Sequence, residues 1–295
     1  MTTEQHLQGP GEAYQLRRAA PVGTPPPTPL VFASPHSGRD YPEEMMAAAA
    51  LDATAIRRSE DAFVDELIAG APEAGVATLT ARLARAYMDV NREPFELDPS
   101  MFVDELPDFA RARTARVAAG LGAIARIVSE GQEIYARKLT FAEARGRIER
   151  AHRPYHAALA RLLGEAHAAH GVAILIDWHS MPAAAARQGG RERPCDMVLG
   201  DRFGAACAGA LTARVEAELE KLGYRVARNT PYAGGYTTEH YGRPARRTHA
   251  LQIEINRALY LDEARLEPTE GFSKLKSDLE TLTRALVAAD WSGLR

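Results

Sequence analysis

Val172-Ala-Ile-Leu-Ile-Asp177-Trp-His179-Ser180-Met-Pro182 is the stretch that decides the fold of this 295-residue chain. Five apolar residues in a row, three of them β-branched, predict a strand that is buried on both faces. In open α/β sheets, ligands bind beyond the carboxyl ends of the strands. Asp177 and His179 alternate out of this strand end, so both can face one site as a metal ligand or a general base. A hydrogen-bonded core histidine is the alternative.

The composition narrows the class of protein. A chain of this length can bury a large core, and its formal net charge of −3 gives no reason to expect nucleic acid or an anionic membrane surface as a partner. The two cysteines form no CxxC pair, which favours a reduced, cytoplasmic protein. No apolar run approaches the roughly 18 residues that cross a bilayer, and the polar N-terminus does not resemble a secretory signal.

A second histidine follows another predicted strand. Residues 1–28 are rich in proline and glycine and predict a flexible N-terminal arm, so the single α/β domain is expected to span residues 29–295. Its first strand, 29–33, leads into Ser34-Pro-His36-Ser37-Gly38-Arg39, where Gly38 allows the backbone to turn closely around a ligand. His36 is therefore a second candidate for the site, with an incidental turn histidine as the alternative.

Acidic residues come next in the chain. Ser59 is a good helix N-cap, and Phe63 and Leu67 would lie on the buried side of a helix that starts there. Glu60 and Asp61 in its first turn complement the helix dipole. The functional alternative is that one of these two acids reaches the strand-end crevice as a metal ligand.

Arginines and an asparagine surround a strand predicted at about residues 87–90. Arg82, Arg85 and Arg92 lie close to Asn91 in the sequence. Arginine binds carboxylates through two parallel hydrogen bonds, and asparagine adds directional donors. The cluster therefore indicates an anion site, with surface salt bridges as the alternative.

A long helical region follows. One helix is expected from about 108 to 129, and a second from about 140 to 169 that is broken near Pro154. His152 and His156 have the spacing of the HExxH motif but lack its glutamate. We expect one of them, His156, to line the edge of a pocket. Further strands are expected at 76–80, 196–200 and 224–228, and further helices at 202–222 and 271–289.

The strand Leu251-Gln-Ile-Glu254-Ile-Asn256-Arg257 places Gln252, Glu254 and Asn256 on one face. Burying an unpaired glutamate costs several kcal/mol, so Glu254 needs a partner or a function. Near a metal, its pKa suits a general base. The glycine-rich loop before this strand, which starts at Asn229 and continues to Arg243, is expected to carry function.

Seven short segments between residues 29 and 263 carry one family resemblance. They are Ser34-Pro-His-Ser-Gly38, Asp61 with Val64-Asp65, Asp89-Val-Asn-Arg92, Pro154-Tyr-His156, Ile176-Asp-Trp-His-Ser-Met181, Asn229-Thr-Pro-Tyr-Ala-Gly-Gly-Tyr236 and Leu251-Gln-Ile-Glu-Ile-Asn256. In content and order they resemble the N-formylglutamate amidohydrolase family. More distantly, the arrangement is similar to zinc carboxypeptidases and to the aspartoacylase/succinylglutamate desuccinylase group. The resemblance implies a single α/β domain, of a hydrolase-like and zinc-carboxypeptidase-like kind, with a mixed, mostly parallel twisted sheet and helices on both faces.

The resemblance also implies a metal site that binds Zn²⁺ or another divalent ion. It makes His36 and His179 zinc ligands. The relatives place an acidic ligand three residues after the first histidine, where this chain has Arg39. The third ligand is therefore expected to be Asp61, with Glu60 as the second choice.

The implied reaction is zinc-dependent hydrolysis of an N-acyl amino acid, above all of N-formyl-L-glutamate to formate and L-glutamate. The resemblance makes Glu254 the general base and places Asn91 and Arg92 at a substrate carboxylate. From the residues themselves we further expect Arg85 (or Arg82) at the oxyanion and Asp177 behind a ligand imidazole. The residues expected around the substrate are His156, Gly234, Gly235, Tyr236, His240 and Arg243. A deacylase or small peptidase for another N-acyl amino acid, and a non-catalytic protein that binds a dicarboxylate, are the alternatives.

Overall fold

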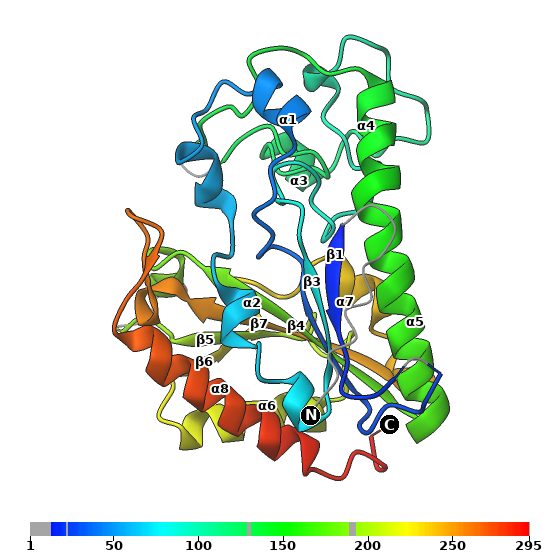
Figure 1. The fold of residues 1–295 in the computed structure, drawn as a ribbon, viewed down its shortest axis with the longest axis vertical. Helices are drawn as coiled ribbons and strands as arrows, with labels where there is room; N and C mark the ends of the chain where they lie inside the picture. The colour runs from blue at the N-terminus through cyan, green and yellow to red at the C-terminus, as the bar shows by residue number, and fades with distance from the viewer. Residues whose placement is uncertain (1–12, 22, 129–130, 189–192, 295) are drawn as a thin grey trace.

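The computed structural model describes residues 13–21, 23–128, 131–188 and 193–294. Within them, a seven-stranded sheet has the order β1-β3-β2-β4-β7-β5-β6 (Figure 1). Its strands are β1 (Tyr14–Arg17), β2 (Leu30–Ser34), β3 (Ala77–Ala81), β4 (Ala173–Met181), β5 (Met197–Gly200), β6 (Val226–Arg228) and β7 (Thr248–Asn256). Two short strands, β8 (Leu261–Asp262) and β9 (Glu267–Pro268), form a separate ribbon.

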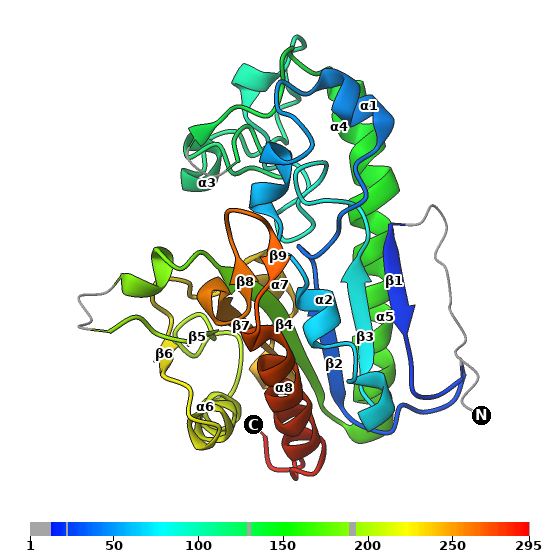
Figure 2. The ribbon, with the colours of Figure 1, turned by 60° about the vertical axis from the view of Figure 1, so that its left-hand side comes forward.

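Helices cover both faces of this sheet. The helices are α1 (Glu43–Ala48), α2 (Val64–Leu67), α3 (Ala115–Ala118), α4 (Phe141–Arg147), α5 (Arg153–His170), α6 (Gly209–Lys221), α7 (Tyr236–Tyr241) and α8 (Gly271–Val287). The helix α5 packs on one face, and α2, α6 and α8 pack on the other (Figure 2). Strands β3, β2, β4 and β7 run parallel to one another, and β5 runs parallel to β6. Strand β1 runs antiparallel to β3, and β5 runs antiparallel to β7. The predicted mixed, mostly parallel α/β fold is confirmed.

The central strand β4 is covered on both faces, which explains why its apolar run is continuous. Ala173 and Leu175 pack into the core on the α5 side, and Ile174, Ile176 and Trp178 pack into the core on the α2 and α8 side. All nine residues of β4 are buried. A strand with helices on both faces cannot alternate between apolar and polar residues, and the polar ones appear only where its carboxyl end leaves the helix layer.

The N-terminal segment contains an edge strand of the sheet. Tyr14 of β1 lies opposite Ala81 of β3, and the Tyr14 and Leu16 side chains are buried. The prediction of a flexible arm is therefore wrong for this segment, because two apolar side chains in an alternating tetrapeptide suffice to bind it to the sheet. Residues 1–12 lie outside the described residues.

Between β3 and α4 the chain forms a lobe with little regular structure, which lies above the sheet (Figure 2). The strand predicted at 87–90 and the helix predicted at 108–129 are both wrong. Tyr87 and Met88 donate turn hydrogen bonds to the carbonyl of Ala84. Among residues 108–128 only α3 is helical, since Gly120, with a φ of 76°, takes the left-handed conformation that ends a helix.

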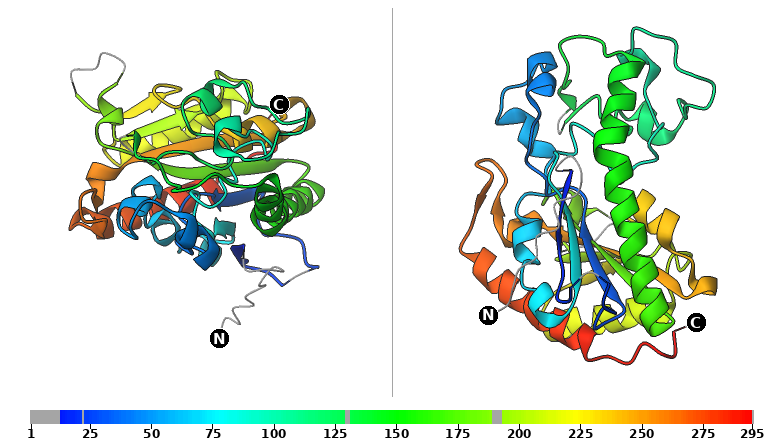
Figure 3. Two further views of the ribbon diagram at one scale, coloured as in Figure 1. Left: turned by 90° about the horizontal axis from the view of Figure 1, so that it is seen from above. Right: turned by 45° about the vertical axis from the view of Figure 1, so that its right-hand side comes forward.

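The predicted long helix at 140–169 exists, and it is not broken near Pro154. A π-helical turn, Ile148–His152, joins α4 to α5, and Pro154, which has no N–H to donate to the preceding turn, lies just after this π-helical turn. The continuous helix runs from the lobe down along the sheet (Figure 3, right). In the part of the chain that the structure describes, no helix is both long and apolar enough to cross a membrane.

Two further predicted helices start later than expected. Ser59 ends a 3₁₀ turn, and α2 begins only after Phe63, whose φ of 63° interrupts the backbone. Arg202 and Phe203 also have positive φ values, of 54° and 56°, so α6 starts at Gly209. Conversely, the predicted glycine-rich loop contains α7. The spacing of apolar residues does not indicate which residues adopt the left-handed conformation, so it could not predict these helix starts.

Candidate active site

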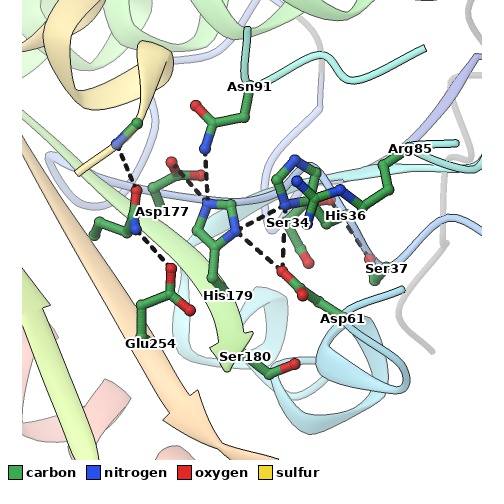
Figure 4. Close-up of polar contacts among 12 residues, drawn as sticks. Ser34, His36, Ser37, Asp61, Arg85, Asn91, Asp177, His179, Ser180 and Glu254 are labelled. Atoms are coloured by element: carbon green, nitrogen blue, oxygen red, sulfur yellow. Dashed lines mark hydrogen bonds and ion pairs between the residues drawn. The ribbon is translucent and has the colours of Figure 1, made fainter. Parts of the chain in front are cut away.

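Three side chains from separate parts of the chain converge at the carboxyl ends of β2 and β4 (Figure 4). The Nδ1 atoms of His36 and His179 are 3.1 Å apart. Oδ2 of Asp61 lies 3.0 Å from Nδ1 of His179 and 3.4 Å from Nδ1 of His36. His36 follows β2, His179 lies within β4, and Asp61 precedes α2. All three are buried, and their ligand atoms lie within 4.8 Å of one another.

The contacts on the far side of each histidine ring leave the Nδ1 atoms of His36 and His179 available to bind a ligand. Nε2 of His36 donates to Oδ1 of Asp89 at 2.7 Å, because a carboxylate can only accept. Nε2 of His179 lies 3.1 Å from Oδ2 of Asp177. Both imidazoles therefore turn Nδ1 inward, with a carboxylate behind each ring, as is typical of metal-binding histidines. Two imidazole nitrogens and one carboxylate fit a divalent metal such as zinc.

Ionised groups balance the buried acids. Burial opposes ionisation of Asp61, but hydrogen bonds from His179 and His36 hold its pKa well below the usual range. Arg257 donates to Oδ1 of Asp61 at 3.0 Å and to the carbonyl of Glu60 at 2.7 Å. Asp61 is thus a fixed carboxylate, with one oxygen held by Arg257 and the other directed at the two histidines.

Asp89 forms a second ionised pair at the edge of the site. Arg85 donates to Oδ2 of Asp89 at 2.7 Å. Burial acts to raise the pKa of Asp89, but Arg85 and His36 hold it well below the usual range. Burial acts to lower the pKa of Arg85, yet Asp89 and Asp61 raise it on balance. Arg85 therefore keeps its positive charge beside the cluster.

Glu254 lies on β7 directly opposite His179 of β4. Its side chain is buried, and Oε1 accepts a hydrogen bond of 2.7 Å from Gln252. Burial raises the pKa of Glu254 to about 7, and Asp61 adds to this effect while His179 opposes it. A carboxyl group with a pKa near neutrality can both accept and return a proton.

These groups form one wall of a pocket of about 520 Å³. Five arginines line it, and the lobe supplies apolar lining residues as well. Besides the cluster and Glu254, the lining includes Arg58, Arg85, Arg92, Arg116, Arg257, Asn91, Leu121, Ile127, Tyr232, Gly234 and Gly235. A pocket of this charge suits a small anionic ligand.

Asn91 and Arg92 both line the pocket, but their polar atoms are already engaged. Nδ2 of Asn91 lies 3.2 Å from Nε2 of His179, and its Oδ1 accepts from the backbone N–H of Thr237 at 2.7 Å. The guanidinium of Arg92 donates to the carbonyls of Leu121 and Asn91 at 3.0 and 2.8 Å. Both residues thus shape the pocket wall, and Arg92 also adds a positive charge to it.

Four residues predicted to bind substrate lie elsewhere. His156, on α5, donates to the carbonyl of Val90 at 2.7 Å and accepts from the hydroxyl of Tyr241 at 2.9 Å, so it supports the pocket from behind. Tyr236 and His240 stack on each other on α7, with ring centroids 5.1 Å apart. Arg243 is exposed and donates to the carbonyl of Gly242. None of the four is part of the pocket lining among the described residues.

The structure also distinguishes Glu60 from Asp61 as the acid of the cluster, and Arg82 from Arg85 as the arginine of the pocket. Glu60 points away from the cluster, where its carboxylate accepts from Tyr41 at 2.8 Å and from Arg57 at 3.0 Å. Arg82 pairs with Asp40 at 3.2 Å, outside the pocket lining, whereas Arg85 lies in it. Arg39, which occupies the position of the expected acid, pairs with Asp65 at 2.7 Å.

Sequence reasoning did not assign Asp89, Arg257 and Gln252 to the site. Asp89 stands between the apolar Met88 and Val90, which is a signal of a buried and paired acid. Arg257 ends the segment that begins at Leu251, and Gln252 shares the polar face of that strand. Their partners are distant in the chain, so no local pattern identifies what they contact.

Comparisons with known proteins identify a family for this chain. The N-formylglutamate amidohydrolase family profile matches residues 28–261. N-formylglutamate deformylase of Pseudomonas aeruginosa is 30% identical over 262 residues, covering 88% of this chain and 90% of the relative. The Pseudomonas putida deformylase is 29% identical over the same length, covering 88% of this chain and 89% of the relative.

A solved structure extends the match to three dimensions. The crystal structure of N-formylglutamate amidohydrolase from Ralstonia eutropha superposes with a TM-score of 0.85 and 39% sequence identity. It covers 93% of this chain and 97% of the relative. From the family profile, the length of the alignments and the shared fold, the chain belongs to the N-formylglutamate amidohydrolase family.

Proposed function

We propose that this protein hydrolyses the formamide bond of N-formyl-L-glutamate, giving formate and L-glutamate. The names of its relatives support the substrate. The observation that carries the chemistry is the pairing of His179 with Glu254 across β4 and β7, inside a pocket lined by five arginines. The metal-binding group and the general base, Glu254, therefore face the same pocket, and its arginines favour an anionic substrate.

His36, Asp61 and His179 would hold zinc or another divalent metal. When bound, such an ion supplies Lewis acidity and lowers the pKa of water to near neutrality. Glu254, with a pKa of about 7, takes a proton from the attacking water and returns it to the leaving nitrogen of glutamate. Its place opposite His179 puts it on the same face of the sheet as the cluster.

Three of the five arginines have a role in this proposal: one at the oxyanion and two at the substrate carboxylates. Arg85 lies next to Asp61 and Asp89, so its charge stabilises the oxyanion that forms from the formyl oxygen. Arg92 and Arg116 lie on the lobe side of the pocket and attract the two carboxylates of the substrate. Within the part of the chain that the structure describes, Arg116 forms one long ion pair, 3.6 Å from Glu96, so it can turn to a ligand.

Release of formate from N-formyl-L-glutamate, compared with hydrolysis of N-acetyl- and N-succinyl-L-glutamate, tests this proposal. The metal content of the purified protein is measured on the same sample. We expect about one divalent ion per chain and a kcat/KM for the formyl substrate at least about 10-fold higher than for the others. Faster cleavage of a larger acyl group would favour another N-acyl amino acid deacylase. Absence of hydrolysis by metal-loaded protein would overturn the proposal.

A further inference from the structure

A chain of two hydrogen bonds connects Glu254 to the loop before α7. The backbone N–H of Gly235 donates to Oε1 of Gln252 at 2.8 Å, and Nε2 of Gln252 donates to Oε1 of Glu254 at 2.7 Å. Gln252 and Glu254 are 4% and 6% exposed, so water competes little for these bonds. The N–H of Gly235 also fixes which end of the Gln252 amide faces Glu254, because only the amide oxygen can accept from it.

The same short segment holds the histidine side of the site. The backbone N–H of Thr237 donates to Oδ1 of Asn91 at 2.7 Å, and Nδ2 of Asn91 contacts Nε2 of His179 at 3.2 Å. A Cβ on Gly235 would lie 2.4 Å from Nδ2 of Asn91, so only glycine allows this approach. Gly235 therefore supports Glu254 through Gln252, and Thr237 fixes the orientation of Asn91 beside His179.

Glu254 uses only one of its oxygens in this arrangement. Oε1 is occupied by Gln252, while Oε2 has no hydrogen-bond partner among the described residues. The free side of the carboxyl group faces His179 and Asp61 (Figure 4). A carboxyl group held at one oxygen cannot rotate freely about its terminal torsion, which is otherwise a broad and soft rotation.

We propose that Gln252 is a positioning residue for the reaction: it holds Oε1 of Glu254 so that Oε2 faces the water to be deprotonated. This inference rests on the proposed function, in which Glu254 moves the proton. Gln252 acts through Glu254 and not on the substrate. Its loss should therefore lower kcat and leave KM nearly unchanged, because a small misplacement of a reacting group reduces the rate by on the order of 10- to 100-fold.

Gln252→Met tests this role, since methionine has a similar length but cannot form either hydrogen bond. Asn256→Leu is the matched control. Asn256 lies on the same face of β7 and is equally buried, and its amide donates to the carbonyl of Cys195 and accepts from Ala258, both at 3.0 Å. This control also loses two buried amide hydrogen bonds, but none that involves Glu254.

A second variant separates positioning from a purely structural role. Gln252→Glu keeps an oxygen that accepts from Gly235 but has no amide to donate to Glu254, and its added carboxyl group changes the pKa of Glu254. The value compared is therefore the kcat on the plateau of the pH profile, above the shifted pKa. If Gln252 only anchors the loop, this variant retains the wild-type plateau kcat. If it positions Glu254, both Gln252 variants lose kcat together. Gln252→Glu also provides the test if Gln252→Met does not fold.

The measurements are kcat and KM for N-formyl-L-glutamate, together with crystal structures of the Gln252 variants. We expect a kcat about 10- to 100-fold lower with KM within about twofold of wild type, near-wild-type kinetics for Asn256→Leu, and a displaced Glu254 carboxyl group. An unchanged kcat, or a loss confined to KM, would overturn the inference. If wild type does not cleave the substrate, the proposed function fails instead. The crystal structures then still decide, because an unmoved Glu254 carboxyl group refutes the positioning role.

Discussion

The backbone N–H of Asp61 donates a hydrogen bond to the carbonyl oxygen of His36, with 2.9 Å between the two atoms. This bond joins the turn after β2 to the turn before α2. It places the Asp61 side chain beside the His36 ring, and the preceding Glu60 side chain then points to Tyr41 and Arg57. Two adjacent buried acids therefore have different surroundings.

Asp61→Asn and Glu60→Gln are expected to differ in metal binding. Asp61→Asn removes the carboxylate directed at both histidines, so we expect metal affinity to fall by about 100-fold or more. Glu60→Gln leaves the cluster intact and should keep the wild-type metal content. Elemental analysis and competition with a chelator measure both. Equal losses in the two variants would contradict the assignment of Asp61 as the ligand.

Glu254→Gln is expected to abolish most of the hydrolysis while the protein remains folded and loaded with metal. An amide cannot accept the proton, and general base catalysis contributes about 100- to 10,000-fold. Formate release and metal content are measured together. Glu239→Gln, at an exposed position of α7, is the control and should keep its activity. Turnover near the wild-type level in Glu254→Gln would show that another group is the base.

Gly38→Ala is expected to destabilise the protein. A Cβ there would lie 2.4 Å from the carbonyl oxygen of Leu83 and 2.7 Å from that of Arg82, both backbone atoms that cannot rotate away. The close approach of Gly38 is thus to another backbone segment rather than to a ligand. Chemical unfolding should show a loss of about 1–3 kcal/mol.

Gly164→Ala provides the opposite case. Gly164 lies within α5, and nothing is within 4 Å of its added Cβ. We expect a gain of about 0.5–1 kcal/mol from the better helix propensity of alanine. A Gly38→Ala protein as stable as Gly164→Ala would show that the turn after β2 can move without cost.

Stability is expected to fall in mild acid because of His156. Burial lowers the pKa of His156 to about 3, with a contribution from His152, against a usual value of 6.5. Between these values the unfolded chain binds a proton that the folded chain excludes. The contribution of His156 is therefore complete above pH 6.5 and is lost as the pH falls toward 3.

His156→Gln isolates this effect, since glutamine does not titrate. On going from about pH 7.5 to about pH 5.5, the free energy of unfolding of the variant should fall by about 1.4 kcal/mol less than that of wild type. Urea unfolding at the two pH values measures the difference. Parallel losses in both proteins would mean that His156 takes up a proton in the folded state.

The sheet and the groups at its strand ends could be predicted because they depend on short-range patterns. The apolar run before Asp177 identifies β4, and alternation places Asp177 with His179 on one face. The same alternation places Gln252 with Glu254 on β7. Parallel strands then bring their carboxyl ends to one edge of the sheet, so the convergence of His179 and Glu254 follows from local rules.

The lobe and the supporting contacts could not be predicted in this way. Residues 108–129 have helix-favouring alanines and arginines, but backbone bonds from Ala123 to Glu96 and from Asp89 to Ala123 fix an irregular path. His156 on α5 is held by hydrogen bonds to Val90 and Tyr241, which belong to distant segments of the chain. Such contacts join segments far apart in sequence, and tertiary interactions override local propensity.

The two sides of the pocket are built from different kinds of structure. His179 and Glu254 stand on adjacent, fully paired strands, whereas Arg116, Leu121 and Ile127 come from the irregular lobe. Replacements at these three lobe positions can change the acyl chain or amino acid that fits without shifting His179 and Glu254, which the ladder of β4 and β7 keeps in register. Substrate preference and bond cleavage can therefore evolve independently within one domain.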